Sequence, residues 1–136
     1  MESVVREIHT KYSESVYTAS VEHDFDLIYV HDWVGMTAAL ALKKKFKKPL
    51  VIHVHSLDSD RIGVNHKSWV YDIEEEALAA ADAIIAVSQY TADCIAKEYP
   101  GATKNITIVH PGMDPVLEIK NDSIDHNNAY TLIDFY

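Results

Sequence analysis

The most informative segment of this chain is Asp26-Leu27-Ile28-Tyr29-Val30-His31-Asp32-Trp33, where an apolar run ends in polar and aromatic side chains. Residues 26–30 are short, apolar and rich in residues that favour extended structure, so they predict a buried strand. An Ala- and Leu-rich segment over 35–46 follows and ends in lysines, which suit the negative end of a helix dipole. Pro49 then stops the predicted helix. A buried strand followed by a helix indicates the first part of a βαβ unit.

The same alternation continues on both sides of this segment. Apolar residues recur at steps of three and four over 3–20, which predicts a helix before the first strand. The remaining predicted elements are strands over 50–54, 83–87 and 106–109 and helices over 71–81 and about 89–99, with Ser88 as the cap of the last helix and a polar loop over 56–67. Such an alternation predicts an α/β fold with a three-layer, Rossmann-like parallel sheet.

Length and composition limit the functional classes. The 136 residues, of which 48% are hydrophobic, suffice for one domain with a core. The net charge of -9 argues against a nucleic-acid partner, because neutralising phosphates requires a basic patch. The single cysteine, Cys94, excludes an intrachain disulfide and fits a reducing compartment. No apolar run approaches the roughly 18 residues of a membrane span, and the N-terminus has no signal-peptide pattern, so we expect a cytoplasmic protein.

Polar side chains follow the first two predicted strands at the point where each strand ends. His31, Asp32 and Trp33 follow the first strand, and His55 and Ser56 follow the second. The carboxyl ends of parallel strands lie on one edge of a sheet, where ligands bind, so we expect these side chains to line one cleft.

Arg61 is one of only two arginines and lies in the polar segment that follows His55. Beside such a cleft, its guanidinium group could clamp a phosphate or orient a sugar. A surface ion pair with the neighbouring aspartates is equally consistent with the sequence. Those aspartates belong to the triplet Asp58-Ser59-Asp60, which in some sugar-transfer enzymes holds a divalent ion, but a solvated loop explains the triplet better.

His53 and His55 lie two residues apart, and therefore on the same face of a strand. Such a pair can bind a metal ion, but a metal site also needs further ligands, and His53 fits the core equally well. We therefore expect no metal ion, and we keep a small metal-dependent hydrolase using these two histidines as the weakest alternative.

Seven segments, taken in order, resemble a known family. They are residues 26–33, the Ala/Leu-rich helix, 48–56, 60–63, 70–74, 80–88 and 108–114. Together they resemble the N-terminal domain of retaining GT-B glycosyltransferases (group 1, glycogen-synthase-like and sucrose-phosphate-synthase-like). The resemblance covers about residues 20–115. It implies one N-terminal half of a GT-B fold that lacks its first strand, with a partial domain over 1–115 and a tail over 116–136 that docks back or mediates association.

The resemblance also implies the chemistry. A glycosyltransferase of this group moves a sugar, here expected to be glucose, from a nucleotide sugar to a glycan or sugar acceptor without a metal ion or other cofactor. By position, His55 would be the catalytic residue near the transferred sugar, and Asp32 and Trp33 would line the acceptor side. His31 would steady that loop, and Ser56 and Arg61 would contact substrate.

The sequence departs from this family pattern in ways that affect activity. The first strand with its Gly-rich loop has no counterpart, the interdomain turn reads Pro111-Gly112-Met113-Asp114, and the donor-binding domain is absent. We therefore expect an isolated chain that is inactive without a donor-domain partner chain. The alternative is a non-catalytic binding or assembly module that self-associates, for instance through Tyr130, Phe135 and Tyr136.

Overall fold

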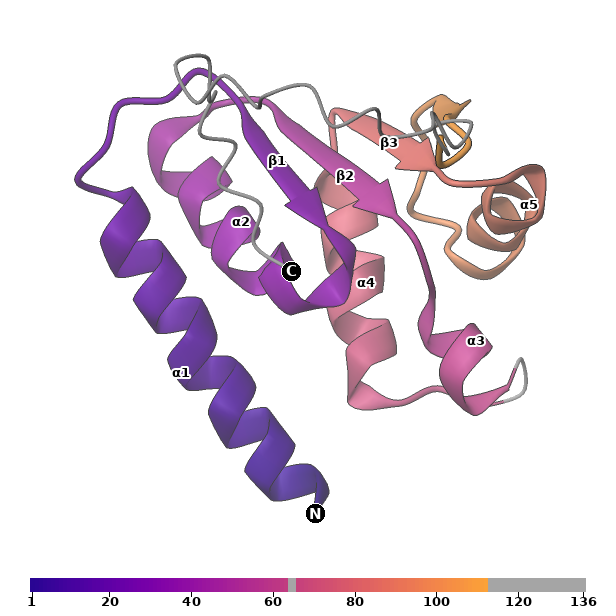
Figure 1. Cartoon of the computed structure of the whole chain (residues 1–136), viewed down its shortest axis with the longest axis horizontal. Helices are drawn as coiled ribbons and strands as arrows, with labels where there is room; N and C mark the ends of the chain where they lie inside the picture. Colours follow the sequence, from indigo (N-terminus) through magenta and orange to yellow (C-terminus); the bar gives the residue numbers. More distant parts are fainter. Residues whose placement is uncertain (64–65, 113–136) are drawn as a thin grey trace, which may run out of the picture.

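The described part of the chain, residues 1–63 and 66–112 of a computed structural model, contains one parallel sheet with strand order β1-β2-β3-β4 (Figure 1). The strands are β1 (Ile28–His31), β2 (Leu50–Val54), β3 (Ala83–Ala86) and β4 (Ile106–Ile108). All four predicted strands are present, and the expected Rossmann-like α/β class is confirmed.

Five helices accompany these strands in the described residues. They are α1 (Glu2–Ser20), α2 (Asp32–Phe46), α3 (Asp58–Ile62), α4 (Trp69–Ala80) and α5 (Gln89–Glu98). Four of them were predicted, α1 from apolar periodicity and the other three from composition and helix-end residues. Ser88 caps α5 as expected, because its hydroxyl oxygen accepts a hydrogen bond from the Thr91 N–H. The short helix α3 was expected to be loop. Its first turn is closed by the Asp60 carboxylate, which accepts a hydrogen bond of 2.8 Å from the Leu57 N–H, and apolar periodicity does not report such a local contact.

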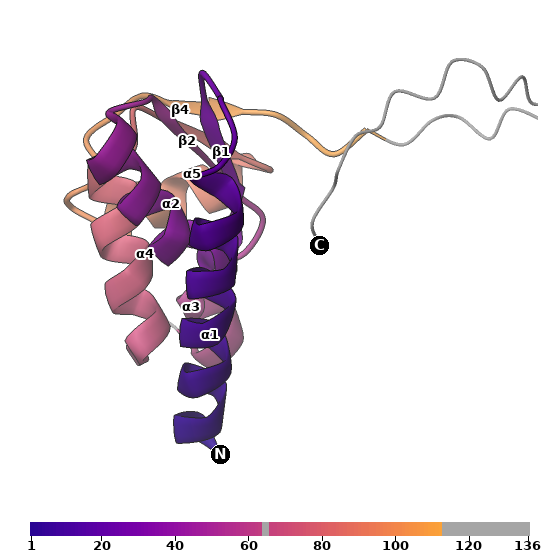
Figure 2. The same ribbon diagram turned by 90° about the vertical axis from the view of Figure 1, so that its left-hand side faces the viewer.

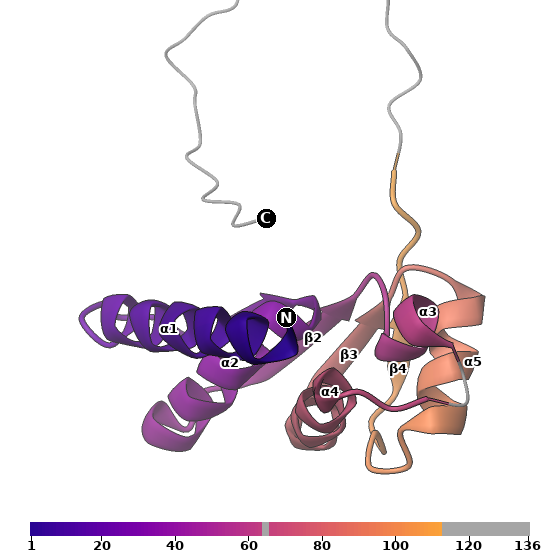
Figure 3. The same ribbon diagram turned by 90° about the horizontal axis from the view of Figure 1, so that it is seen from below.

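The core lies between one face of the sheet and the helices. The buried positions of the central strands include Leu50, Ile52 and Val54 of β2 and Ile84 and Ala86 of β3. Right-handed crossovers between strands that are added in one direction place their helices on the same face. Seen from below, α2 and α4 lie together on one side of the strands (Figure 3). The helix α1 packs along α2 (Figure 2).

The opposite face of β1 and β2 is more open. It carries Tyr29 and His31 of β1 and Val51 and His53 of β2, and Tyr29 is 45% exposed. The helices α2 and α4, which connect β1 to β2 and β2 to β3, lie on the other face (Figure 3). This open face continues to the carboxyl ends of the two strands.

Some expectations fall outside the described residues. They concern Met113 and Asp114 of the expected interdomain turn and the tail over 116–136. Among the described helices, none is both long enough and apolar enough to cross a membrane.

Candidate functional site

The carboxyl ends of β1 and β2 are tied together by one side chain. β1 continues directly into α2, and Asp32 at this junction has a φ of 51°, in the left-handed region that aspartate tolerates better than most residues. Its Oδ1 atom accepts hydrogen bonds from the backbone N–H groups of His55 at 2.6 Å and Ser56 at 3.3 Å. Asp32 therefore fixes the start of the segment that follows β2 against the start of α2.

Three imidazoles lie next to the hydrogen bonds of Asp32, on the open face of the sheet. The His31 Nδ1 and His55 Nε2 atoms are 2.9 Å apart and form a hydrogen bond. The rings of His53 and His55 stack with their centroids 4.3 Å apart, and the Tyr29 Oη atom forms a hydrogen bond of 2.8 Å with His53 Nδ1. Burial lowers the pKa of His53, and the His55 and His31 rings lower it further, while Asp32 raises it. The neutral form of His53 is therefore favoured.

Arg61 brings the helix α3 into contact with the same strand ends. Its Nη1 atom donates a hydrogen bond of 3.1 Å to Ser56 Oγ, and its guanidinium carbon lies 6.0 Å from the centre of the Trp33 ring. Its Nη2 atom donates to Glu74 Oε1 at 2.7 Å. The ion pair of Arg61 is thus made with Glu74 of α4, and the expected pair with the neighbouring aspartates is not the one that forms.

Glu74 holds Arg61 in place with a carboxylate that is fully buried. It accepts hydrogen bonds from the Asp58 N–H at 3.0 Å and from Tyr99 Oη at 2.5 Å, in addition to Arg61. Burial raises the pKa of Glu74, while the hydrogen bonds from Tyr99, the Asp58 N–H and Arg61 lower it. The sequence did not single out Glu74, because an acidic residue is rarely expected in a core, although its spacing from the buried Tyr71 and Leu78 places it on the same helix face.

The triplet Asp58-Ser59-Asp60 is not a solvated loop that could hold an ion. Asp58 is 2% exposed, and its two carboxylate oxygens accept hydrogen bonds from the N–H and the hydroxyl of Ser68, at 2.8 and 2.7 Å. Asp60 closes the first turn of α3 as described above. Both carboxylates are therefore already used to hold α3 and the start of α4 in place.

The structure brings together all the residues expected at this edge of the sheet. They are His31, Asp32, Trp33, His55, Ser56 and Arg61, joined by the contacts described above. Ser88 is used as a helix cap, and His110 is exposed beyond β4. Tyr29 was not among the expected site residues, although its alternation with His31 places both side chains on the same face of β1.

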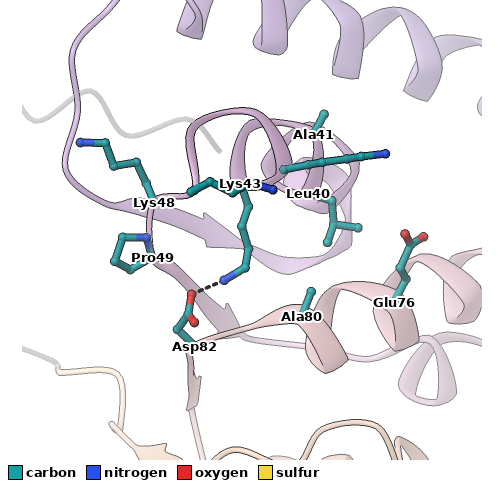
Figure 4. A pocket seen from close by; sticks show the side chains of 10 residues that line it. Leu40, Ala41, Lys43, Lys48, Pro49, Glu76, Ala80 and Asp82 are labelled. Carbon is teal, nitrogen blue, oxygen red and sulfur yellow. Dashed lines mark hydrogen bonds and ion pairs between the residues drawn. The ribbon is translucent and has the colours of Figure 1, made fainter.

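A pocket of about 680 Å³ lies away from this edge, between the C-terminal half of α2 and the end of α4 (Figure 4). Lys43, Lys48, Pro49, Ala80 and Asp82 contribute to its lining. Lys43 forms an ion pair with Asp82 and holds the pKa of that carboxyl below its usual range. Pro49 and Asp82 directly precede β2 and β3, so this pocket is at the amino ends of the strands, opposite to the edge where parallel sheets bind ligands.

Comparisons with known proteins extend this description. Residues 8–117 match the model of Glycosyltransferase Family 4. The chain is also similar to the glycogen synthases of two Mycobacterium tuberculosis strains, CDC 1551 / Oshkosh and ATCC 25618 / H37Rv. Each is 25% identical over 97 residues, which cover 65% of this chain and 22% of the relative. The chain thus spans about a fifth of the length of the curated relatives it matches.

Proposed function

Because the chain belongs to Glycosyltransferase Family 4, we propose that it forms the acceptor-side domain of a retaining glycosyltransferase that transfers a sugar from a nucleotide sugar. The observation that supports this role most directly is a cluster of side chains in mutual contact at the carboxyl ends of β1 and β2, the edge where open parallel sheets bind their ligands. The cluster consists of His31, Asp32, Trp33, His55, Ser56 and Arg61. We further propose glucose as the transferred sugar and a glycan or sugar as the acceptor, since the two similar proteins are glycogen synthases.

Each residue of the cluster has a role in this proposal. The ring of His55 contacts the transferred sugar, and His31 orients that ring through the hydrogen bond of 2.9 Å. Since the N–H of His55 already donates to Asp32, the ring and the carbonyl group of His55 are its groups available to substrate. Fixed polar groups of this kind stabilise a developing oxocarbenium-like charge without having to reorganise during the reaction.

The remaining residues form the acceptor side. Trp33 offers an apolar ring surface to a sugar, and Asp32, Ser56 and Arg61 offer polar groups in a restricted geometry. Asp32 acts chiefly by holding the backbone that carries His55. The donor nucleotide is bound by groups outside this chain, on another domain or on a partner chain.

Acceptor binding is the direct test, and it requires no turnover. We expect that titrating the ¹⁵N-labelled chain with maltoheptaose shifts the amide signals of His55 and Ser56 and the indole signal of Trp33. The Ser56→Ala variant, which keeps the Asp32 tie to the backbone, is expected to weaken binding. Ser15→Ala, at an exposed position of α1, is the matched control and should bind as the unmodified chain does. Shifts confined to the lysines around the α2–α4 pocket, or no shifts at all, would contradict the proposal.

A non-catalytic assembly role is the second candidate, and the open face of β1 and β2 favours it. Tyr29 is 45% exposed there, and Val51 and His53 are only half-buried. A second copy of the chain that packs on this face would cover these side chains. Sedimentation velocity over a wide range of concentrations tests this role, and a strictly monomeric profile at high concentration excludes it.

A further inference from the structure

The open face of the sheet places three imidazoles from two strands within reach of one ion. His31 and His53 are register partners in the parallel pair β1–β2, so their side chains leave the sheet side by side. His55 follows His53 by two positions and therefore points to the same face. β1 supplies His31, and β2 and the residue after it supply His53 and His55. The three imidazoles therefore come together only because β1 pairs with β2.

The nitrogen atoms of these rings are already close to one another. One ring nitrogen from each of the three histidines lies within 4.8 Å of the other two, and the His31 Nδ1 and His55 Nε2 atoms are 2.9 Å apart. In a tetrahedral zinc site with Zn–N distances near 2.05 Å, the ligating nitrogens are about 3.3 Å apart. To reach that separation, the side chains of His53 and His55 must rotate out of their stacked arrangement, and the ion replaces the hydrogen bond between His31 and His55.

Within the described part of the chain, one ring nitrogen of His53 is left without a partner. The Nε2 atom of His53 is buried and has no hydrogen-bond partner among the described residues. Buried polar atoms in native proteins are nearly always satisfied, and an unsatisfied one requires an explanation, such as a bound ion. The other ring nitrogen of His53 is held by the Tyr29 hydroxyl at 2.8 Å. Metal-binding histidines are typically oriented in this way, through a hydrogen bond on the nitrogen that does not bind the metal.

We propose that His31, His53 and His55 bind a divalent transition-metal ion of the zinc, cobalt, nickel and copper class. Imidazole nitrogen suits this class, whereas magnesium and calcium prefer oxygen ligands. Three protein nitrogens leave a fourth position open to water or to another ligand. The sequence shows only the His53 and His55 pair as a metal motif, and the third ligand comes from β1 through the tertiary structure.

The site uses two histidines that the sugar-transfer proposal also uses, and the ion would replace the hydrogen bond between them, so the metal-bound chain is a separate state from the one that contacts the sugar. Its test needs neither donor nor acceptor. The untagged chain is titrated with Co²⁺ while the visible absorption bands of the ion are recorded, and Zn²⁺ is then added as a competitor. We expect one ion per chain, absorption bands typical of a four-coordinate ion, and displacement of Co²⁺ by Zn²⁺.

Single substitutions locate the ligands. His31→Ala, His53→Ala and His55→Ala are each expected to weaken Co²⁺ binding at least about tenfold, and Tyr29→Phe about tenfold, because it removes the hydrogen bond that orients His53. His110→Ala, at an exposed histidine beyond β4, is the matched control and should bind normally. Far-UV circular dichroism of every variant checks that it is folded.

A direct measurement on the unmodified chain guards against variants that fail to fold. Long-range ¹H–¹⁵N spectra with Zn²⁺ should shift the ring nitrogens of His31, His53 and His55 and leave those of His9 and His110 in place. Absence of 1:1 Co²⁺ binding, equal shifts at all histidines, or a His110→Ala variant that loses as much affinity as the cluster variants would each overturn the proposal.

Discussion

At the scale of single residues, the buried carboxylate of Glu74 accepts hydrogen bonds from more donors than any other carboxylate of the described residues. Three donors meet on it: the Arg61 guanidinium and the Asp58 N–H, both of α3, and the hydroxyl of Tyr99, which follows α5. Removing a carboxylate of this kind leaves each donor without a partner, and one of them is a cation.

We therefore expect Glu74→Ala to lower the free energy of unfolding by about 3 kcal/mol, as measured by urea denaturation. Glu76→Ala, at an exposed position of the same helix, is the control and should change it by less than about 0.5 kcal/mol. Tyr99→Phe, which removes one of the three donors, should cost about 1–2 kcal/mol. Equal losses in Glu74→Ala and Glu76→Ala would show that the network does not hold α3 on α4.

A second residue-scale prediction concerns His9, which lies in α1 against the rings of Trp33 and Trp69. Burial lowers the pKa of His9, and the hydrogen bond to the Val34 carbonyl oxygen raises it by less. The folded protein therefore binds the proton of His9 more weakly than the unfolded chain does. Stability from this group is present above a pH of about 6.5 and is lost as the pH falls through the lowered pKa.

Urea denaturation at a series of pH values between about 7.5 and 5.5 measures this effect. The free energy of unfolding should fall with decreasing pH, and the fall should be shallower in His9→Gln. His53 contributes in the same direction, so the comparison of the two slopes isolates His9. His23→Gln, at an exposed histidine, is the matched control, and a slope in His9→Gln equal to that of the unmodified chain would contradict the prediction.

At the scale of elements, the contact between α2 and β1 depends on a glycine inside the helix. Glycine in a helix interior normally costs about 1 kcal/mol relative to alanine, so Gly35→Ala would stabilise an isolated helix. In this fold, a Cβ atom at Gly35 would lie 2.6 Å from Cγ2 of Val30, a stiff β-branched side chain of β1. The helix packs too closely on the strand for any larger residue at this position.

Gly35→Ala is therefore expected to lower the free energy of unfolding by about 1–3 kcal/mol, against its helix propensity. A double-mutant cycle gives the cause. In a Val30→Ala background the clash is removed, and the same glycine substitution should then be neutral or stabilising. If Gly35→Ala destabilised both backgrounds equally, the close approach of α2 to β1 would not be the reason.

At the scale of the whole molecule, the chain corresponds to a limited part of the relatives that it matches. It covers 22% of each glycogen synthase to which it is similar, and the proposed donor site lies outside it. We expect the purified chain alone to show little or no release of nucleotide diphosphate from UDP-glucose or ADP-glucose in the presence of maltoheptaose. A coupled assay for the released nucleotide measures this, and robust turnover by the chain alone would contradict it.

Much of the fold was predictable because the sequence patterns that indicate strands and helices involve neighbouring residues. Apolar runs marked all four strands, periodic apolar residues marked α1, and composition and helix-end residues marked α2, α4 and α5. The short helix α3 was not predicted, because its stability comes from the Asp60 carboxylate and from the burial of Asp58 rather than from an apolar stripe. The start of α4 was predicted at residue 71, whereas α4 begins at Trp69.

The sequence by itself determined the order of strands and helices, the parallel α/β class and the polar residues at the carboxyl ends of β1 and β2. These are local properties, because strand and helix periods and the positions that follow a strand can be read from neighbouring residues. Only the tertiary structure decided that His31 joins His53 and His55, that Arg61 pairs with Glu74, and that one face of β1 and β2 stays open. Those outcomes depend on strand register, on the helix faces that pack together and on the side to which each crossover turns, and all three are set by contacts between residues far apart in the chain.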